Sequence, residues 1–389
     1  MAERGLEVCL CQKSPIPLDV ELECAPQEML ALVGPSGSGK STVLRAIAGL
    51  TRVAEGHVAC NGVRWFDAAR KIELTPRQRR IGFVFQHYGL FPHLSAVANV
   101  MEAMVEIASV ERERRARDLL ARVHLDGLEQ RLPAELSGGQ QQRVAVARAL
   151  AREPNVLLLD EPFAAVDRST RERLYAELAE LRRELSIPVI LVTHDLDEAQ
   201  MLADRMSVLY QGKTLQTGTP YEVITRPESA QVAQLVGLKN VFRAGVVGHD
   251  AHNGETVIEW RKQRLRAPFQ PAFPSGTQVT WAVSQGQLVL LGQGRVPPTA
   301  RHNVVDGVIT QLVRLGNNAA LAVAVGGAER PPLFMSVPLH VAQDHGLAVG
   351  AAVTISLVKD GIHLMPADAG SEPESAAHRR MQPASDLVA

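Results

Sequence analysis

The sequence predicts an α/β domain with a mixed, mostly parallel sheet, followed by a small all-β, OB-like domain. Up to about residue 235, short aliphatic runs alternate with longer helical periods, as in parallel strands joined by helices. Beyond about residue 240 the helical periods vanish, and short strands follow one another between Gly, Pro and Asn. The length of 389 residues is sufficient for two or three domains.

Four apolar runs mark the sheet of the first domain. They are EMLALVG, IGFVFQ, NVLLLD and PVILVTH, and their continuous hydrophobicity is typical of strands buried on both faces. The intervening periodicity predicts helices over residues 41–48, 111–123, 138–152, 169–185 and 197–203. We assign 1–236 to this domain, with a helical subdomain at about 87–150.

The second domain is predicted over 237–366. The segment RVPPTARHN divides its strand-like runs into two groups, which predicts two small barrels over 240–293 and 302–366. The last stretch, 367–389, has few apolar residues to bury and is expected to be a disordered tail.

Charge and hydropathy exclude several classes of function. The 41 basic and 42 acidic residues give a formal net charge of -1, so we expect no nucleic-acid partner. No apolar run approaches the roughly 18 residues of a membrane-spanning helix, and the start of the chain is unlike a secretory signal. We therefore expect a cytoplasmic protein whose four cysteines are reduced.

A glycine-rich loop follows the first apolar run and precedes a helix. Its residues fit the phosphate-binding pattern GxxxxGK[ST], in which backbone N–H groups surround phosphates, the lysine reaches the outer phosphates and the last hydroxyl meets Mg²⁺. The predicted nucleotide-binding residues are Gly34, Pro35, Ser36, Gly37, Ser38, Gly39, Lys40 and Ser41.

Two acids end the run VLLLDE. At the end of a parallel strand, Asp160 is expected to hold Mg²⁺, and Glu161 to orient or deprotonate the attacking water. A strand that ends in acids is common, so this pair gains weight only from its neighbours.

Upstream, the stretch LSGGQQQR opens a helical pattern, and here the chain resembles the ATP-binding cassette (ABC) ATPases. The resemblance implies ATP and Mg²⁺ as ligands. It also implies a head-to-tail homodimer in which Ser137, Gly138, Gly139 and Gln140 of one copy close over the ATP held by the other. A helix N-terminus with Ser and Gly is a second anion-binding feature, which agrees with that role.

Three further positions match the family. Gln86 matches the glutamine that contacts Mg²⁺ and the water, His194 the histidine at the γ-phosphate, and Asp167 the aspartate of the dimer interface. Taken singly, such a His is more often a structural residue, and such a Gln is more often a solvated one. The family's aromatic residue under the adenine has no counterpart before Trp65, so aliphatic contacts from 14–18 are expected instead.

The partners follow from the same resemblance. The aromatic stretch Tyr88-Gly89-Leu90-Phe91-Pro92 is expected to form the wall of a groove for a membrane permease. The all-β extension is similar to that of import ATPases, which work with separate permease subunits and a solute receptor. This places the chain peripherally on the cytoplasmic face of the inner membrane.

Molybdate is the leading solute. The stretch 62–100 is similar to the molybdate-import ATPase, and Thr299, Arg301 and Lys359 are the nearest matches to the oxyanion-binding residues of molybdate proteins. His302 stands where an arginine is expected, and the alternative for all three residues is a solvated surface role. Sulfate, ferric iron, polyamine or sugar remain alternative solutes. A soluble ABC ATPase acting on nucleic acid or the ribosome, and a P-loop kinase, are the alternatives from other classes.

Overall fold

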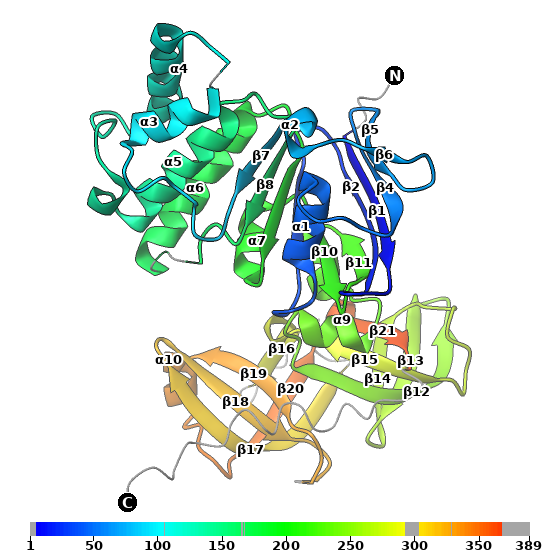
Figure 1. The fold of residues 1–389 in the computed structure, drawn as a ribbon. Helices are drawn as coiled ribbons and strands as arrows, with labels where there is room; N and C mark the ends of the chain where they lie inside the picture. The colour runs from blue at the N-terminus through cyan, green and yellow to red at the C-terminus, as the bar shows by residue number, and fades with distance from the viewer. Residues whose placement is uncertain are drawn as a thin grey trace, which may run out of the picture. The chain divides into compact units, whose positions relative to one another are not determined.

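The protein forms two compact units, Met1–Pro220 and Tyr221–Ala389 (Figure 1). The computed structural model describes residues 5–104, 106–164, 166, 168–291, 303–327 and 329–367. We predicted the boundary after residue 236, but Ala233 joins a small core with Ala282 and Met365. The short helices before residue 236 therefore belong to the second unit.

The first unit contains a mixed sheet with helices. Its strands are β1 (Leu6–Gln12), β2 (Leu18–Cys24), β3 (Met29–Val33), β4 (Glu55–Cys60), β5 (Val63–Asp67), β6 (Ile72–Glu73), β7 (Ile81–Val84), β8 (Val156–Asp160), β9 (Val189–Thr193), β10 (Arg205–Tyr210) and β11 (Lys213–Gly218). Its helices are α1 (Lys40–Ala48), α2 (Pro76–Arg79), α3 (Ala96–Met101), α4 (Ser109–Arg122), α5 (Gly138–Leu150), α6 (Arg168–Glu184) and α7 (Leu196–Leu202).

Parallel pairing brings the ends of the central strands together. The sheet order is β6-β5-β4-β1-β2-β11-β10-β3-β9-β8-β7, and β3, β9, β8 and β7 are mutually parallel. Val33 pairs with Thr193, and Asp160 pairs with Val192. The residues that follow these strands therefore emerge at one edge of the sheet.

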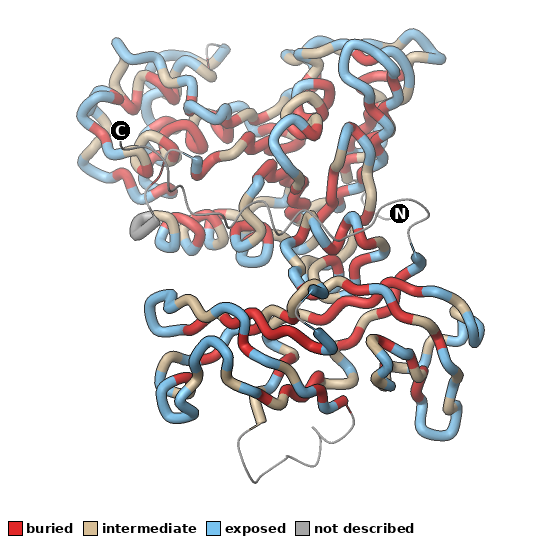
Figure 2. Tube along the Cα trace, turned by 90° about the horizontal axis from the view of Figure 1, so that it is seen from below, coloured by how far each residue is buried: buried red, intermediate tan, exposed pale blue. Residues whose placement is uncertain are grey.

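The central strands are buried on both faces, as their sequences predict. Leu158 and Ile190 belong to one hydrophobic core with residues of α1, whereas Leu157 and Leu191 belong to another core with residues of α5 and α6. Alternate residues of a strand point to opposite faces, so α1 and α5 cover opposite faces of the sheet. Buried segments run through the interior of this unit in Figure 2.

A buried arginine holds the far end of α1. The guanidinium of Arg79 donates hydrogen bonds to the carbonyl oxygens of Ala46 at 2.8 Å, Ile47 at 2.6 Å and Leu74 at 3.0 Å. Two of these carbonyls belong to the last turn of α1, where a cation also interacts favourably with the helix dipole. Arg79 thereby fixes the helix that follows the glycine-rich loop.

The second unit contains two five-stranded sheets, with orders β14-β13-β12-β15-β21 and β16-β20-β17-β18-β19. The strands are β12 (Asn240–Asp250), β13 (Glu255–Trp260), β14 (Gln263–Pro268), β15 (Gln278–Val283), β16 (Leu288–Leu291), β17 (Val304–Leu315), β18 (Asn318–Ala324), β19 (Leu333–Pro338), β20 (Ala352–Leu357) and β21 (Ile362–Pro366). The helices are α8 (Pro220–Thr225), α9 (Ala230–Leu235) and α10 (Leu339–Asp344).

This arrangement differs from the two consecutive barrels that we predicted. Strand β16 precedes the predicted division but pairs with β20 in the second sheet, and β21 follows it but pairs with β15 in the first. Each sheet is completed by a strand from the other part of the chain, and one hydrophobic core includes residues of both sheets. Helix α10 was not predicted. Except for its first residue, the predicted tail lies outside the described residues.

Leu158→Ala tests the double-sided burial of the sheet. We expect this substitution to lower the free energy of unfolding of the first unit by about 2–5 kcal/mol, because it leaves a cavity in a fully buried strand. Val110→Ala, at a side chain that is 87% exposed, is the control and should change it by less than about 0.5 kcal/mol. Urea unfolding followed by circular dichroism measures the free energy of unfolding of both variants. Equal losses in the two variants would contradict the burial of Leu158 in the sheet.

Candidate functional site

The glycine-rich loop joins β3 to α1 and needs its glycines for steric reasons. A Cβ atom at Gly34 would lie 2.1 Å from the carbonyl oxygen of Leu209, and the φ of Gly34 is +155°. Gly39 caps α1 with a φ of 100° and no side-chain hydrogen bond. No side chain at Gly39 therefore caps the first N–H groups of α1. An anion site at a helix N-terminus requires such free N–H groups.

Lys40 lies over this loop. Its Nζ donates hydrogen bonds to the carbonyl oxygens of Gly34 at 2.7 Å and Pro35 at 3.1 Å. Burial lowers the pKa of Lys40, while Glu161 and Asp160 act in the opposite direction. The Ser38 hydroxyl is buried without a hydrogen-bond partner. A buried cation beside an unsatisfied hydroxyl fits a polyanionic ligand such as a triphosphate.

Ser41 and Asp160 provide the oxygen atoms that suit Mg²⁺. The Ser41 hydroxyl donates a hydrogen bond of 2.9 Å to Oδ1 of Asp160. Burial raises the pKa of Asp160, and the hydrogen bond from Ser41 opposes that shift. Magnesium prefers a few carboxylate and hydroxyl oxygens together with substrate phosphates, so this pair fits the ion.

Glu161 lies between the other two predicted catalytic side chains. Its Oε2 is 3.3 Å from Nδ1 of His194 and 3.5 Å from Nε2 of Gln86. The Glu161 side chain is 19% exposed and that of His194 is 60% exposed, so both are accessible to a ligand. The three residues follow β8, β9 and β7, whose parallel alignment explains why distant parts of the sequence meet here.

The signature stretch starts a different helix. Ser137 caps α5: its hydroxyl accepts from the Gln140 N–H at 3.3 Å, and Gln140 Oε1 accepts from the Ser137 N–H at 2.9 Å. The hydroxyl proton of Ser137 is not used in this capping box, so it is available to an anion. A Cβ atom at Gly139 would approach Leu174 to 3.1 Å, which favours glycine there.

Comparison with known proteins agrees with this geometry. The family described as ABC transporter matches residues 18–164. The sulfate/thiosulfate import ATP-binding protein CysA of Burkholderia pseudomallei is 45% identical over 90% of this chain and 94% of its own length. The chain belongs to the ABC transporter ATP-binding family. This ABC ATPase is thus a nucleotide hydrolase, as the signature stretch predicted.

Other relatives of this ABC ATPase carry different solute names. The Fe(3+) ions import ATP-binding protein FbpC 1 of Rhizobium meliloti is 42% identical, over 89% of this chain and 92% of its own. The spermidine/putrescine import ATP-binding protein PotA of Pseudomonas fluorescens is 39% identical, over 75% and 78%. The solved structure of cbiO1 from Clostridium perfringens is 29% identical, with a TM-score of 0.51, over 57% of this chain and 90% of its own.

Of the other predicted residues, the structure describes only Lys359. Asp167, Thr299 and Arg301 lie outside the described residues. Lys359 is described, and its Nζ donates to Oε1 of Glu255 at 3.3 Å. Glu255 also accepts a 2.9 Å hydrogen bond from Arg266; burial raises the pKa of Glu255, but these two donors outweigh it and leave that pKa lowered. An acid that faces Lys359 weakens its attraction for an oxyanion.

The predicted aromatic wall is only partly exposed. Tyr88 is buried in the core, so it does not line a groove, whereas Phe91 is 43% exposed and lies under the guanidinium of Arg148. Arg148 also donates hydrogen bonds to the carbonyls of Tyr88 and Gly89, which folds this stretch back onto α5. The prediction that Tyr88 lines a groove is therefore wrong, because its side chain packs in the hydrophobic core.

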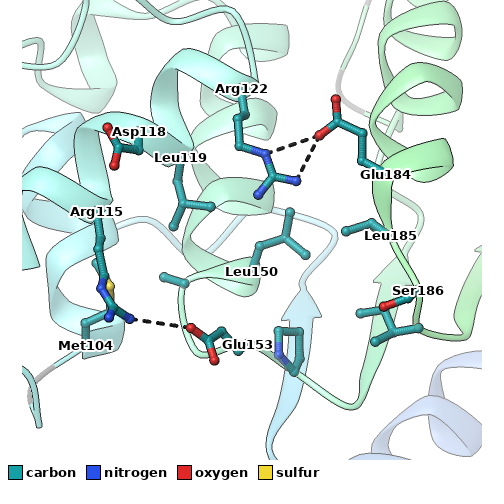
Figure 3. Close-up of a pocket in the computed structure, with 13 residues that line it drawn as sticks. Met104, Arg115, Asp118, Leu119, Arg122, Leu150, Glu153, Glu184, Leu185 and Ser186 are labelled. Atoms are coloured by element: carbon teal, nitrogen blue, oxygen red, sulfur yellow. Dashed lines mark hydrogen bonds and ion pairs between the residues drawn. The ribbon is translucent and has the colours of Figure 1, made fainter.

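A pocket of about 520 Å³ lies at the edge where β8 and β9 begin, opposite the candidate site (Figure 3). Ion pairs Arg122–Glu184 and Arg115–Glu153 flank it. Its apolar lining comes from Met104, Leu119, Leu150, Leu185 and Ile187.

Among the helices of the described chain, none is long and apolar enough to cross a membrane.

The sequence motifs did not point to the residues behind His194. Thr193 and Glu198 are both buried and share a hydrogen bond of 2.6 Å. The one available signal was an acid four residues after His194, within the predicted helix 197–203, and an acid in the first turn of a helix is ordinarily explained by the helix dipole. Because Glu198 is buried, the interaction with the helix dipole is not a sufficient reason for an acid at this position.

Lys40→Ala tests the loop as a triphosphate site. Loss of the buried cation should weaken ATP binding by about 100-fold or more, because a charge-assisted contact in a site shielded from water is lost. Arg183→Ala, which removes an exposed cation from α6, should bind ATP like the unaltered protein. Equilibrium binding of a fluorescent ATP analogue measures both; tight binding by the Lys40 variant would refute the assignment.

Proposed function

We propose that this protein is the ATP-hydrolysing subunit of an importer, coupling closure of a homodimer on two ATP molecules to solute uptake through a separate permease. The observation that carries the proposal is the position of Glu161, held between Gln86 and His194 beside the Ser41–Asp160 pair. An acid, two polar neighbours and an Mg²⁺-type oxygen pair are the groups that phosphoanhydride hydrolysis needs.

The phosphate loop binds and orients the triphosphate. Backbone N–H groups at the start of α1 and the ammonium of Lys40 attract its oxygens, and Ser41 with Asp160 would hold Mg²⁺. When bound, that ion neutralises charge that develops on the phosphates. Positioning and electrostatic stabilisation are the main contributions of a protein to phosphoryl transfer, and these residues provide both.

Glu161 acts on the water. Its carboxylate accepts the proton of the attacking water or orients it toward the γ-phosphate, and the products are ADP and phosphate. His194 can donate to both groups when both of its ring nitrogens carry protons: Nδ1 then donates to Glu161, and Nε2 donates to the γ-phosphate. Gln86 approaches the same carboxylate oxygen from the end of β7.

The site is completed by a second copy of the chain. Helices α1 and α5 cover opposite faces of the sheet, so their two anion-binding N-termini are carried on different faces of one copy. Ser137, Gly138, Gly139 and Gln140 of the partner copy then close over the triphosphate, and Asp167 lies at the dimer interface. Because each ATP is then bound by residues of both copies, ATP binding stabilises the dimer.

The pocket in Figure 3 is our candidate surface for the permease. Its apolar lining suits one face of a short amphipathic helix, and ion pairs on its rim can exchange partners with charges of that helix. Phe91 does not line this pocket, but its partly exposed side chain is a second permease contact, retained from the 88–92 stretch that we expected to form a groove wall. The solute receptor acts through the permease, and the protein binds peripherally on the cytoplasmic face.

A small oxyanion is the proposed solute. The CysA relative named for sulfate/thiosulfate import supports sulfate, and the similarity of 62–100 supports molybdate. The pairing of Lys359 with Glu255 weakens the molybdate argument, so we place sulfate first. The relatives named for ferric iron and spermidine/putrescine support those solutes as alternatives. An action on nucleic acid is less favoured because of the net charge of -1.

Glu161→Gln separates ATP binding from hydrolysis. The amide keeps the shape but cannot take a proton, so we expect ATP binding to persist, steady-state phosphate release to fall about 100–1000-fold, and an ATP-bound dimer to accumulate. Size-exclusion chromatography with ATP and a phosphate-release assay give the two readouts. Glu55→Gln, at an exposed strand position, is the control. Unchanged turnover in the Glu161 variant would rule out its role.

Solute choice is tested in the assembled importer. With the cognate permease and receptor in vesicles, sulfate should stimulate ATP hydrolysis several-fold, because a loaded receptor favours dimer closure. Molybdate, tungstate, ferric iron and spermidine are compared at equal concentrations. Stimulation by molybdate and tungstate alone would reverse our order of oxyanions, and stimulation by ferric iron or spermidine alone would overturn the oxyanion proposal.

A further inference from the structure

Both neighbours of His194 are held by buried contacts. The hydroxyl of Thr193 donates to Oε2 of Glu198 at 2.6 Å and accepts from the N–H of Asp195 at 2.9 Å. A single buried hydroxyl therefore ties the residue before His194 to the residue after it. The backbone of His194 has little freedom while these two hydrogen bonds persist.

Glu198 is an unusual residue to find behind an exposed histidine. It is 4% exposed, and its second carboxylate oxygen accepts a 3.1 Å hydrogen bond from the hydroxyl of Tyr175. Burial raises the pKa of Glu198, and the hydrogen bonds from Thr193 and Tyr175 oppose that shift. A buried carboxyl group is costly, and an apolar residue would fill this space at lower cost. Packing alone does not account for an acid here.

Helix α6 holds the other side of His194. Arg171 approaches Oδ2 of Asp195 to 3.3 Å and donates to the carbonyl oxygen of Val166 at 3.1 Å. Arg171 and Tyr175 are four residues apart, so they lie on the same face of α6. The helix that follows the predicted interface residue Asp167 thus contacts Asp195 and Glu198, both of which follow His194 in the sequence.

We propose that Glu198 is a positioning residue for ATP hydrolysis, which holds the His194 imidazole against Glu161 through Thr193. The inference rests on the proposed function, since it requires that His194 act in hydrolysis. Glu198 touches neither the phosphate loop nor the Ser41–Asp160 pair in any hydrogen bond of the described residues. Its loss should therefore reduce turnover rather than ATP binding.

Glu198→Gln is the first test. Whichever way the amide is turned, its N–H₂ group faces one of the two hydroxyl donors, so one hydrogen bond is lost or reversed and the side chain moves relative to Thr193. We expect kcat to fall about 10- to 100-fold, as for other small misplacements of a catalytic group, with the KM for ATP within about twofold of the original. Asp197→Asn, at the exposed acid one position earlier, is the matched control and should retain its kcat.

A double-mutant cycle separates positioning from a purely structural role. If Glu198 acts through His194, adding Glu198→Gln to His194→Ala should lower kcat by less than about twofold beyond His194→Ala alone. If the two effects multiply, Glu198 acts elsewhere and the inference is wrong. If His194→Ala is impaired but Glu198→Gln is fully active, the inference fails while the proposed function stands. Full activity of His194→Ala would overturn both.

A second pair of variants covers poor folding of the Glu198 variant, which thermal unfolding would reveal. Thr193→Val removes the hydroxyl with little change of shape, and Thr193→Ser keeps it. We expect Thr193→Val to lose kcat about as Glu198→Gln does, and Thr193→Ser to keep most of it. Equal kcat values for Val and Ser at this position would contradict the inference, because the hydroxyl would then have no role.

Discussion

The parallel alignment of β3, β9, β8 and β7 is the constraint on which the site depends. It places the ends of four strands at one edge, where the glycine-rich loop, His194, Asp160 with Glu161, and Gln86 follow in turn. Parallel strands require helical crossovers, and burial of both faces under helices makes the strands almost wholly apolar. The same burial fixes the strand ends firmly enough to orient catalytic groups.

The charged and polar side chains at this edge explain why the site suits a triphosphate with its cation. The edge collects a buried lysine, two acids and an unsatisfied Ser38 hydroxyl, a combination that is costly without a ligand and favourable with a triphosphate and its cation. Arg79 contacts the last turn of α1, and Glu198 lies behind His194, and neither has a hydrogen bond to the phosphate loop or the Ser41–Asp160 pair among the described residues. Each is buried and satisfied by hydrogen bonds.

The motifs predicted most of the first unit because their chemistry is local. A glycine pattern after an apolar run, or an acid pair at its end, depends on neighbours in the sequence. Tyr88, Glu198 and the exchange of β16 and β21 between two sheets depend on contacts between distant residues, which neither spacing nor composition encodes. Helix α10 was missed because its six residues are too few for a clear helical period.

The central claim is that each ATP site is shared between two copies of the chain. Mixing two inactive variants tests it directly. Lys40→Ala disables the phosphate loop and Ser137→Arg blocks the signature stretch, so each protein alone should hardly hydrolyse ATP. In a mixed dimer, one site combines an intact loop from the second variant with an intact signature from the first. We predict that mixing restores phosphate release well above either protein alone; no recovery, despite demonstrated mixed dimers, would contradict the shared site.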